Sequence, residues 1–127
     1  MTVRPLPAVR EQDVLRAIKQ YLELRGFRMY RRNTGGAYAM RLGRDQFVRF
    51  SEPGAADLTG REIGTGRTIE VEVKRAGGRT NPQRERLQQA WLDLAKRDGC
   101  IAFRAASIED CEAALVEAYG YHRRLLV

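Results

Sequence analysis

The sequence TIEVEVK, residues 68–74, alternates apolar and polar side chains. Its apolar residues fall on one face of an extended chain, and Glu70, Glu72 and Lys74 fall on the other. This period of two is typical of a half-buried β-strand with its polar face turned outward. Such a face usually carries scattered polar residues, whereas this one aligns two carboxylates with an ammonium group. We therefore take this strand as the element around which the chain is organised.

A third acidic residue, Asp57, ends the segment PGAAD at residues 53–57, shortly before this strand. An Asp, a Glu and a Lys brought together suit metal-assisted attack on a phosphodiester, because carboxylates bind a hard cation that stabilises charge on the phosphorane. Lysine is rare in this chain: of 23 basic residues, only Lys19, Lys74 and Lys96 are lysines. Because lysine can release its proton and arginine cannot, Lys74 indicates a chemical requirement.

The length of 127 residues suits one domain spanning residues 1–127. The formal net charge of +7 at pH 7 favours a polyanionic partner such as nucleic acid. No apolar run approaches the ~18 residues of a membrane span, and the N-terminal residues lack the apolar core of a secretory signal. We therefore expect a cytoplasmic protein with no membrane partner. A single histidine and two cysteines that are not spaced as a metal pair argue against zinc or histidine-based catalysis.

Residues 8–25 carry apolar side chains at helical spacing and precede Gly26, which predicts an amphipathic helix. Glu11 comes three and four residues before Val14 and Leu15, so it projects from the same side as the apolar stripe. It could complement the helix dipole at the rim of the core. A carboxylate at the edge of a buried face also needs a partner, and a metal would be one. The residues alone leave both interpretations of Glu11 open.

Residues 27–32 alternate apolar and basic side chains, which predicts a strand, and the glycine-containing segment 33–36 ends it. Residues 37–50 suit a strand or a hairpin. Arginines gather between Phe27 and Asp45, with interleaved aromatic residues: Arg28, Arg31, Arg32, Arg41 and Arg44. They form either a phosphate-contacting surface or an ordinary solvated basic face.

Two strands are predicted around the glycine-rich turn at residues 60–66. A short strand including residues 57–59 precedes the turn, and the strand containing residues 68–74 follows it. Asn81 is a suitable N-cap and Pro82 a suitable first residue for the next helix. We expect the core-facing stripe of that helix to contain Leu87, Ala90, Trp91, Leu94 and Ala95.

An apolar strand at residues 100–105 and a helix opening with Ser107 and Asp110 complete the chain. We interpret Cys100 and Cys111 as small core residues. The passage from strand through helix to strand implies a right-handed crossover and a parallel pair. The expected fold is a small α/β sheet covered by helices.

These motifs in this order resemble the core of PD-(D/E)XK nucleases. Asp57 and the run EVK at residues 72–74 match its acids and lysine. The longer runs GAADL (54–58), EVKRAGGR (72–79), GCIA (99–102) and SIED (107–110) resemble more closely the VRR-NUC family. The likeness extends from about Glu11 to Leu115. It implies an αβββαβ core with a mixed central sheet, flanked by helices and followed by a C-terminal helix.

The resemblance also implies a site, residue by residue. The family's helix-borne glutamate falls on Glu11, its metal-binding aspartate on Asp57 and its strand glutamate on Glu72. Lys74 takes the place of the water-orienting lysine. The backbone carbonyl of Val73 would complete the oxygen shell of a Mg²⁺ or Mn²⁺ ion.

The sequence departs from the family pattern at two places. The residue before the aspartate is usually proline and here is Ala56, which loosens the backbone but removes no ligand. The family's glutamine, at the start of the helix after the lysine, matches Gln83 best, with Gln88 as the alternative. Glu70 matches no motif position, and we interpret it as a solvated or salt-bridged residue.

The small stand-alone members of this family act as structure-selective DNA endonucleases, often as homodimers, in phage and bacteria. The resemblance therefore implies a metal-dependent DNA endonuclease in the phage or bacterial host cytoplasm, with an activity like that of Holliday-junction resolvases, acting on branched or duplex DNA as a homodimer. The residues expected to contact nucleic acid are Arg31, Arg32, Asn33, Arg75, Arg79 and Gln83.

Two other functions are alternatives to a DNA endonuclease. A non-catalytic nucleic-acid-binding accessory module on a nuclease-like fold would explain the charge equally well. Three carboxylates facing a polyanion argue against a module that only binds, because each carboxylate would repel phosphate in the absence of a cation. A restriction-type enzyme that reads bases is a weaker alternative, because little of the chain remains for a recognition element.

Overall fold

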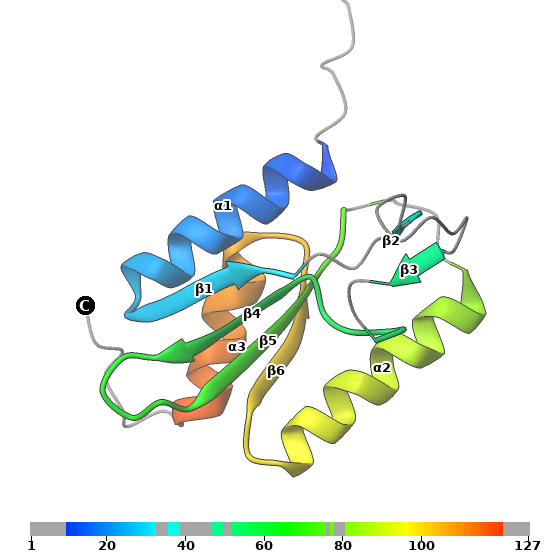
Figure 1. The fold of residues 1–127 in the computed structure, drawn as a ribbon. Coiled ribbons are helices and arrows are strands. Elements are labelled where there is room, and N and C mark those ends of the chain that lie inside the picture. Colours follow the sequence, from blue (N-terminus) through cyan, green and yellow to red (C-terminus); the bar gives the residue numbers. More distant parts are fainter. Residues whose placement is uncertain are drawn as a thin grey trace, which may run out of the picture.

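A computed structural model describes residues 10–32, 36–38, 47–49, 52–75, 77 and 81–120 (Figure 1). In these residues three helices and six strands follow one another along the chain: α1 (Glu11–Leu24), β1 (Phe27–Arg31), β2 (Gly36–Tyr38), β3 (Phe47–Arg49), β4 (Leu58–Glu62), β5 (Thr68–Val73), α2 (Pro82–Arg97), β6 (Ile101–Ala105) and α3 (Ile108–Tyr119).

Four of the strands form a mixed sheet in the order β1-β4-β5-β6. β1 pairs with β4 and β4 with β5 in antiparallel fashion, whereas β5 and β6 are parallel and are joined through α2. The short strands β2 and β3 pair antiparallel with each other in a separate sheet, as the hairpin interpretation of residues 37–50 predicts. The predicted α/β class and the mixed, helix-flanked sheet are confirmed (Figure 1).

The main core lies between one face of the sheet and the helices α1 and α3. Ile69, Val71 and Val73 are fully buried on this face, where they pack with Leu22 of α1 and Leu115 of α3. These residues are the apolar half of the alternating pattern in β5. A smaller cluster lies on the opposite face, under α2, and consists of Ala56, Leu92, Ala95 and Ala102, with Trp91 and Cys100 packed against it.

β5 is buried on both faces, so the prediction of a half-buried strand is wrong. Glu70 and Glu72 on its polar face are as inaccessible as the apolar residues beside them. The reason is that β5 is an inner strand and that α2 covers the face on which both glutamates lie. Alternation along a strand separates its two faces but does not say whether a helix covers the polar one.

The predicted core stripe of α2 is also partly wrong. Leu87 and Leu94 are 51% and 56% exposed, whereas Gln88, Leu92 and Ala95 are buried. The helix is thus rotated so that the amide of Gln88 points to the acidic face of β5 and small residues meet the sheet. Its start is as predicted, with Pro82 as first residue and with two backbone N–H groups donated to the Asn81 side chain.

The strand β4 continues through Gly60 and Arg61 to Glu62, where the sequence predicted a turn. Gly60 is needed here for close packing, because a Cβ atom would collide with the carbonyl oxygen of Arg28 and the sulfur of Met29 in the adjacent strand. The turn follows instead at residues 63–65. A glycine inside a strand marks a close approach here rather than a strand end.

The ends of the other helices follow the sequence. The hydroxyl of Ser107 accepts a hydrogen bond of 3.1 Å from the backbone N–H of Asp110 and caps α3, as predicted. The first helical residue of α1 is Glu11, and residues 1–9 lie outside the described chain. Cys111 is buried as expected, whereas Cys100 is only half-buried. No described helix is both long and apolar enough to pass through a bilayer.

The loop that carries Asp57 packs directly against α2 through Gly54. Gly54 has a φ of +85°, and a Cβ atom on it would lie 2.6 Å from the carbonyl oxygen of Leu87. Two constraints therefore require glycine: a left-handed backbone and contact with the helix backbone, which has no freedom to move aside.

We expect Gly54→Ala to destabilise the protein more than Gly99→Ala. Gly99 has a similar φ of +92° but nothing within 4 Å of its Cβ position, so alanine there adds only backbone strain of about 1–2 kcal/mol. At Gly54 the collision with Leu87 should add roughly 1–3 kcal/mol. Chemical denaturation of the two variants measures the difference. Equal losses would show that the loop can move away from α2.

Candidate active site

Pairing of β4 with β5 brings the first two predicted site residues together. In this antiparallel pair Leu58 lies opposite Val71, so Asp57, just before β4, comes opposite Glu72. Because Leu58 and Val71 face the main core, Asp57 and Glu72 point to the other face, under α2. The Oδ2 atom of Asp57 accepts a hydrogen bond of 2.9 Å from the backbone N–H of Val73, which fixes the carboxylate against β5.

Gln88 connects the remaining predicted residues. Its Nε2 donates to Oε1 of Glu72 at 2.8 Å, and its Oε1 accepts from Nζ of Lys74 at 2.7 Å. Nζ of Lys74 also lies 3.8 Å from Oε1 of Glu72. The preferred match of the family glutamine to Gln83 is therefore not the one that the geometry favours. Gln83 is exposed on the first turn of α2, where its backbone N–H donates to Asn81, whereas Gln88 touches both the acid and the lysine.

Only one of the two carboxyl oxygens of Glu72 accepts a hydrogen bond among the described residues. Glu72 is 2% exposed, and its Oε2 atom is buried without a hydrogen-bond partner among the described residues. Burial raises the pKa of Glu72 to about 8, the neighbouring Asp57 carboxylate adds to the increase, and the charges of Lys74 and Arg84 oppose it. Burial of Glu72 beside a second carboxyl group therefore favours the neutral form of Glu72 unless a cation compensates its charge.

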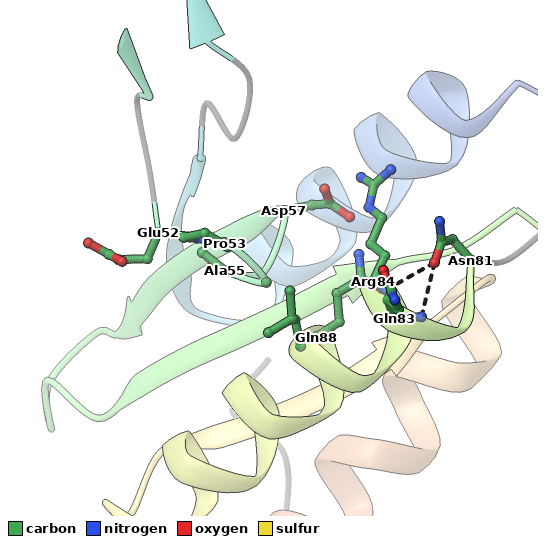
Figure 2. A pocket seen from close by; sticks show the side chains of 10 residues that line it. Glu52, Pro53, Ala55, Asp57, Asn81, Gln83, Arg84 and Gln88 are labelled. Carbon is green, nitrogen blue, oxygen red and sulfur yellow. Dashed lines mark hydrogen bonds between the residues drawn. The ribbon is translucent and has the colours of Figure 1, made fainter. Parts of the chain in front are cut away.

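An open cavity of about 480 Å³ adjoins this acidic pair (Figure 2). The loop at residues 52–57 forms one wall and the first two turns of α2 form the other. Asp57 and Gln88 lie on its lining, so the cavity gives access to the acids from outside. The full lining is Glu52, Pro53, Gly54, Ala55, Asp57, Asn81, Gln83, Arg84, Leu87 and Gln88.

Glu11 is not joined to the acidic pair. It is exposed on the first turn of α1. Within the described ranges, no three His, Cys, Asp or Glu side chains lie close enough to hold a metal ion. The structure therefore brings together Asp57, Glu72 and Lys74, and it adds Gln88 to them but not Glu11.

Arg32, predicted to contact nucleic acid, is instead held inside the protein. Its guanidinium makes two hydrogen bonds of 3.0 Å with the carboxylate of Glu70 and lies over the ring of Trp91, 5.1 Å from its centroid. It also donates to the carbonyl of Ala56 at 2.9 Å, while its backbone N–H donates to the carbonyl of Asp57 at 2.8 Å. Of the two interpretations of Glu70, the salt-bridged one is confirmed.

These contacts hold the loop before β4 in position at Ala56. Arg32 binds the carbonyl groups of both Ala56 and Asp57, and thus fixes the backbone directly before β4 from the side of β1. Glu70 and Trp91 in turn orient its guanidinium. Arg32 is therefore a structural residue that supports Asp57, with little freedom to reach a phosphate.

The other predicted nucleic-acid contacts divide into two groups. Arg31 and Arg75 are exposed, at the end of β1 and just after Lys74. Asn33 and Arg79 lie outside the described residues, as do Arg41, Arg44 and His122. Sequence reasoning missed Arg84, which lines the cavity. Its position four residues before Gln88, on the same side of a helix, is the signal that could have found it.

Comparisons with protein-family models, curated proteins and solved structures found no match.

We expect Arg32→Ala to destabilise the protein by about 3–5 kcal/mol, because it leaves the Glu70 carboxylate buried without its partner. The double variant Arg32→Ala/Glu70→Ala should lose less than the sum of the two single variants. Urea denaturation of the four proteins gives the coupling energy. Simple additivity would mean that the ion pair does not hold the loop.

The raised pKa of Glu72 predicts how the metal-free protein responds to pH. The folded state holds the Glu72 proton up to about pH 8, whereas the unfolded chain releases it near 4.5, so the free energy of unfolding should fall as pH rises between these values. Glu72→Gln should remove this loss and be more stable than the parent at pH 8.5, with a smaller difference at pH 5.5. Chemical denaturation in chelator at the two pH values tests this. Glu52→Gln, a change at an exposed residue, is the control and should follow the parent. A parent protein as stable at pH 8.5 as at 5.5 would contradict it.

Proposed function

We propose that the protein is a divalent-metal-dependent nuclease that hydrolyses phosphodiester bonds in DNA, built on a PD-(D/E)XK core of the VRR-NUC kind. The observation that carries the proposal is one connected group, Asp57, Glu72, Lys74 and Gln88, beside an open cavity. The element order from α1 to β6, without the separate hairpin β2–β3, agrees with the αβββαβ pattern that the resemblance implies.

The donor set suits a hard cation. Oε2 of Glu72 is a buried oxygen with no hydrogen-bond partner in the described part of the chain, and it belongs to a carboxyl group that lies beside a second one. Oxygen donors of this kind favour Mg²⁺ or Mn²⁺ over softer metals. We assign Asp57, Glu72 and the carbonyl of Val73 as ligands, and Glu11 as a further ligand that would have to approach from the exposed end of α1. A cation bound there would supply stabilisation of charge on the phosphorane and a lower pKa for the attacking water.

The protein's own residues orient the acids and the water. Gln88 occupies Oε1 of Glu72 and so leaves Oε2 free for a ligand. The same amide accepts a hydrogen bond from Nζ of Lys74. The Lys74 side chain is 29% exposed, so another of its N–H groups can donate a hydrogen bond to a water or phosphate oxygen. The backbone N–H of Val73 fixes one oxygen of Asp57 and leaves the other available.

DNA is the proposed partner because of the net charge of +7 and the resemblance. Arg31 and Arg75 are exposed and suited to bind backbone phosphates without reading bases, and Asn33 and Arg79 stay predictions from the sequence. Such binding should be tolerant of sequence and sensitive to salt. Selectivity for branched DNA and action as a homodimer rest on the resemblance alone.

One observation favours the alternative of a non-catalytic binding module. The third acid, Glu11, stays exposed, and the described part of the chain contains no complete three-acid metal group. A binder would retain its affinity for DNA in chelator, whereas a nuclease requires the divalent ion for turnover.

The test offers labelled four-way junction, flap and duplex DNA to the purified protein with Mn²⁺, and again with chelator. Asp57→Ala and Lys74→Ala should each lower the cleavage rate by at least about a hundredfold, because they remove a ligand and the residue that orients the water. Gln88→Ala should cause a smaller loss. Asp93→Ala, an exposed acid elsewhere on α2, is the matched control and should cleave like the parent.

DNA affinity should persist in Asp57→Ala, which separates binding from chemistry. Cleavage by Asp57→Ala at the parental rate would refute the assignment. Binding without cleavage on any substrate, with or without metal, would establish the binding module instead.

A further inference from the structure

Arg84 projects from the first turn of α2 on the side of the cavity where the Asp57 carboxylate lies (Figure 2). It sits one helical turn before Gln88, on the same face of the helix. Its charge is felt by Glu72, whose pKa it lowers. Arg84 is thus the basic residue of this cavity lining, and it lies four residues before Gln88.

The guanidinium of Arg84 is not used within the described structure. The hydrogen bond that Arg84 makes comes from its backbone N–H, which donates to Oδ1 of Asn81 at 3.4 Å. Among the described residues no carboxylate lies within ion-pair distance of its side chain, in contrast to Arg32 and Arg104, which are paired. An exposed arginine near the buried Glu72 and the half-buried Asp57, paired with neither, has its fork of N–H donors available for an external anion.

We propose that the cavity between the loop at residues 52–57 and α2 binds a backbone phosphate of the DNA strand being cleaved, and that Arg84 is its anion-binding residue. This inference rests on the proposed nuclease function. The volume of about 480 Å³ accommodates a phosphate with its sugar. Two acidic residues, Glu52 and Asp57, lie on the lining together with Arg84, so a bound anion depends on the charge of Arg84. Asn81 already accepts the N–H groups of Gln83 and Arg84, so a side chain, not the helix backbone, must hold the anion.

Asp57 lines the same cavity, which makes phosphate binding depend on the cation. Without metal, the Asp57 carboxylate at the cavity lining disfavours a phosphate there. With a divalent cation on the acids, this repulsion is neutralised and Arg84 can contact the phosphate. The contribution of Arg84 to DNA affinity should therefore be larger with metal than without it.

The experiment measures binding of a labelled duplex in Ca²⁺ and in chelator, Mn²⁺ binding by calorimetry, and cleavage in Mn²⁺. Arg84→Ala should weaken DNA binding in Ca²⁺ by about tenfold, the effect of one lost charge-assisted hydrogen bond, and by less in chelator. It should not weaken Mn²⁺ binding, because the lost charge repels cations. Arg84→Lys should keep part of the affinity. Arg86→Ala, an exposed arginine on α2 outside the cavity lining, is the control and should change binding no more than twofold, to about the same extent in both conditions.

The outcomes separate this inference from the function beneath it. A parent that cleaves DNA while Arg84→Ala and Arg86→Ala bind and cleave alike would overturn the role of Arg84 and leave the nuclease intact. Equal losses for Arg84→Ala in Ca²⁺ and in chelator would reduce Arg84 to part of the general basic field, which also overturns the proposal. A parent that neither binds Mn²⁺ nor cleaves would overturn the proposed function and this inference with it.

Discussion

Two carboxyl groups, those of Asp57 and Glu72, are held against each other under a helix, and the rest of the site depends on this contact. The register of β4 with β5 enforces it, because Asp57 and Glu72 lie directly opposite in adjacent strands. The strands cannot separate the two acids without losing the core that Leu58 and Val71 form on the other face. The unfavourable proximity is thus built into the sheet, and the burial that raises the pKa of Glu72 follows from it.

The two glutamates of β5 show what distinguishes a structural acid from a candidate functional one. Both are buried on the same face under α2. Both oxygens of Glu70 are bound by Arg32, so its charge is compensated within the protein. Only one oxygen of Glu72 is bound, by an uncharged amide. The ammonium of Lys74 lies 3.8 Å from that same oxygen, and the carboxyl group of Asp57 is a second acid beside it. A buried carboxylate left in this state is unfavourable unless something outside the protein completes it.

Much of the fold follows from local signals in the sequence, but several site contacts do not. The strand at β5 and the helix caps at Asn81 and Ser107 follow from local signals and are predicted correctly. The partner of Arg32, Glu70, is distant in sequence, and nothing near Arg32 in the sequence indicates this ion pair. Alternation also could not show that the polar face of β5 is covered. The role of Glu11 as a metal ligand stays a prediction. Glu11 is exposed on α1 and does not contact the acidic group in this structure, and nothing there tests whether it binds a metal.

The rotation of α2 relative to the predicted stripe changes which of its side chains meet the acidic face of β5. Apolar periodicity favoured a stripe through Leu87 and Leu94, yet both are exposed. The face that α2 turns inward instead carries Gln88 toward the acidic pair and Trp91 toward Arg32, at helical spacing. Burying the leucines would turn Gln88 away and leave Glu72 without its hydrogen bond in a covered site, which costs about 1–3 kcal/mol. The hydrogen bond from Gln88 to Glu72 thus offsets much of the free energy lost by leaving the two leucines half-exposed.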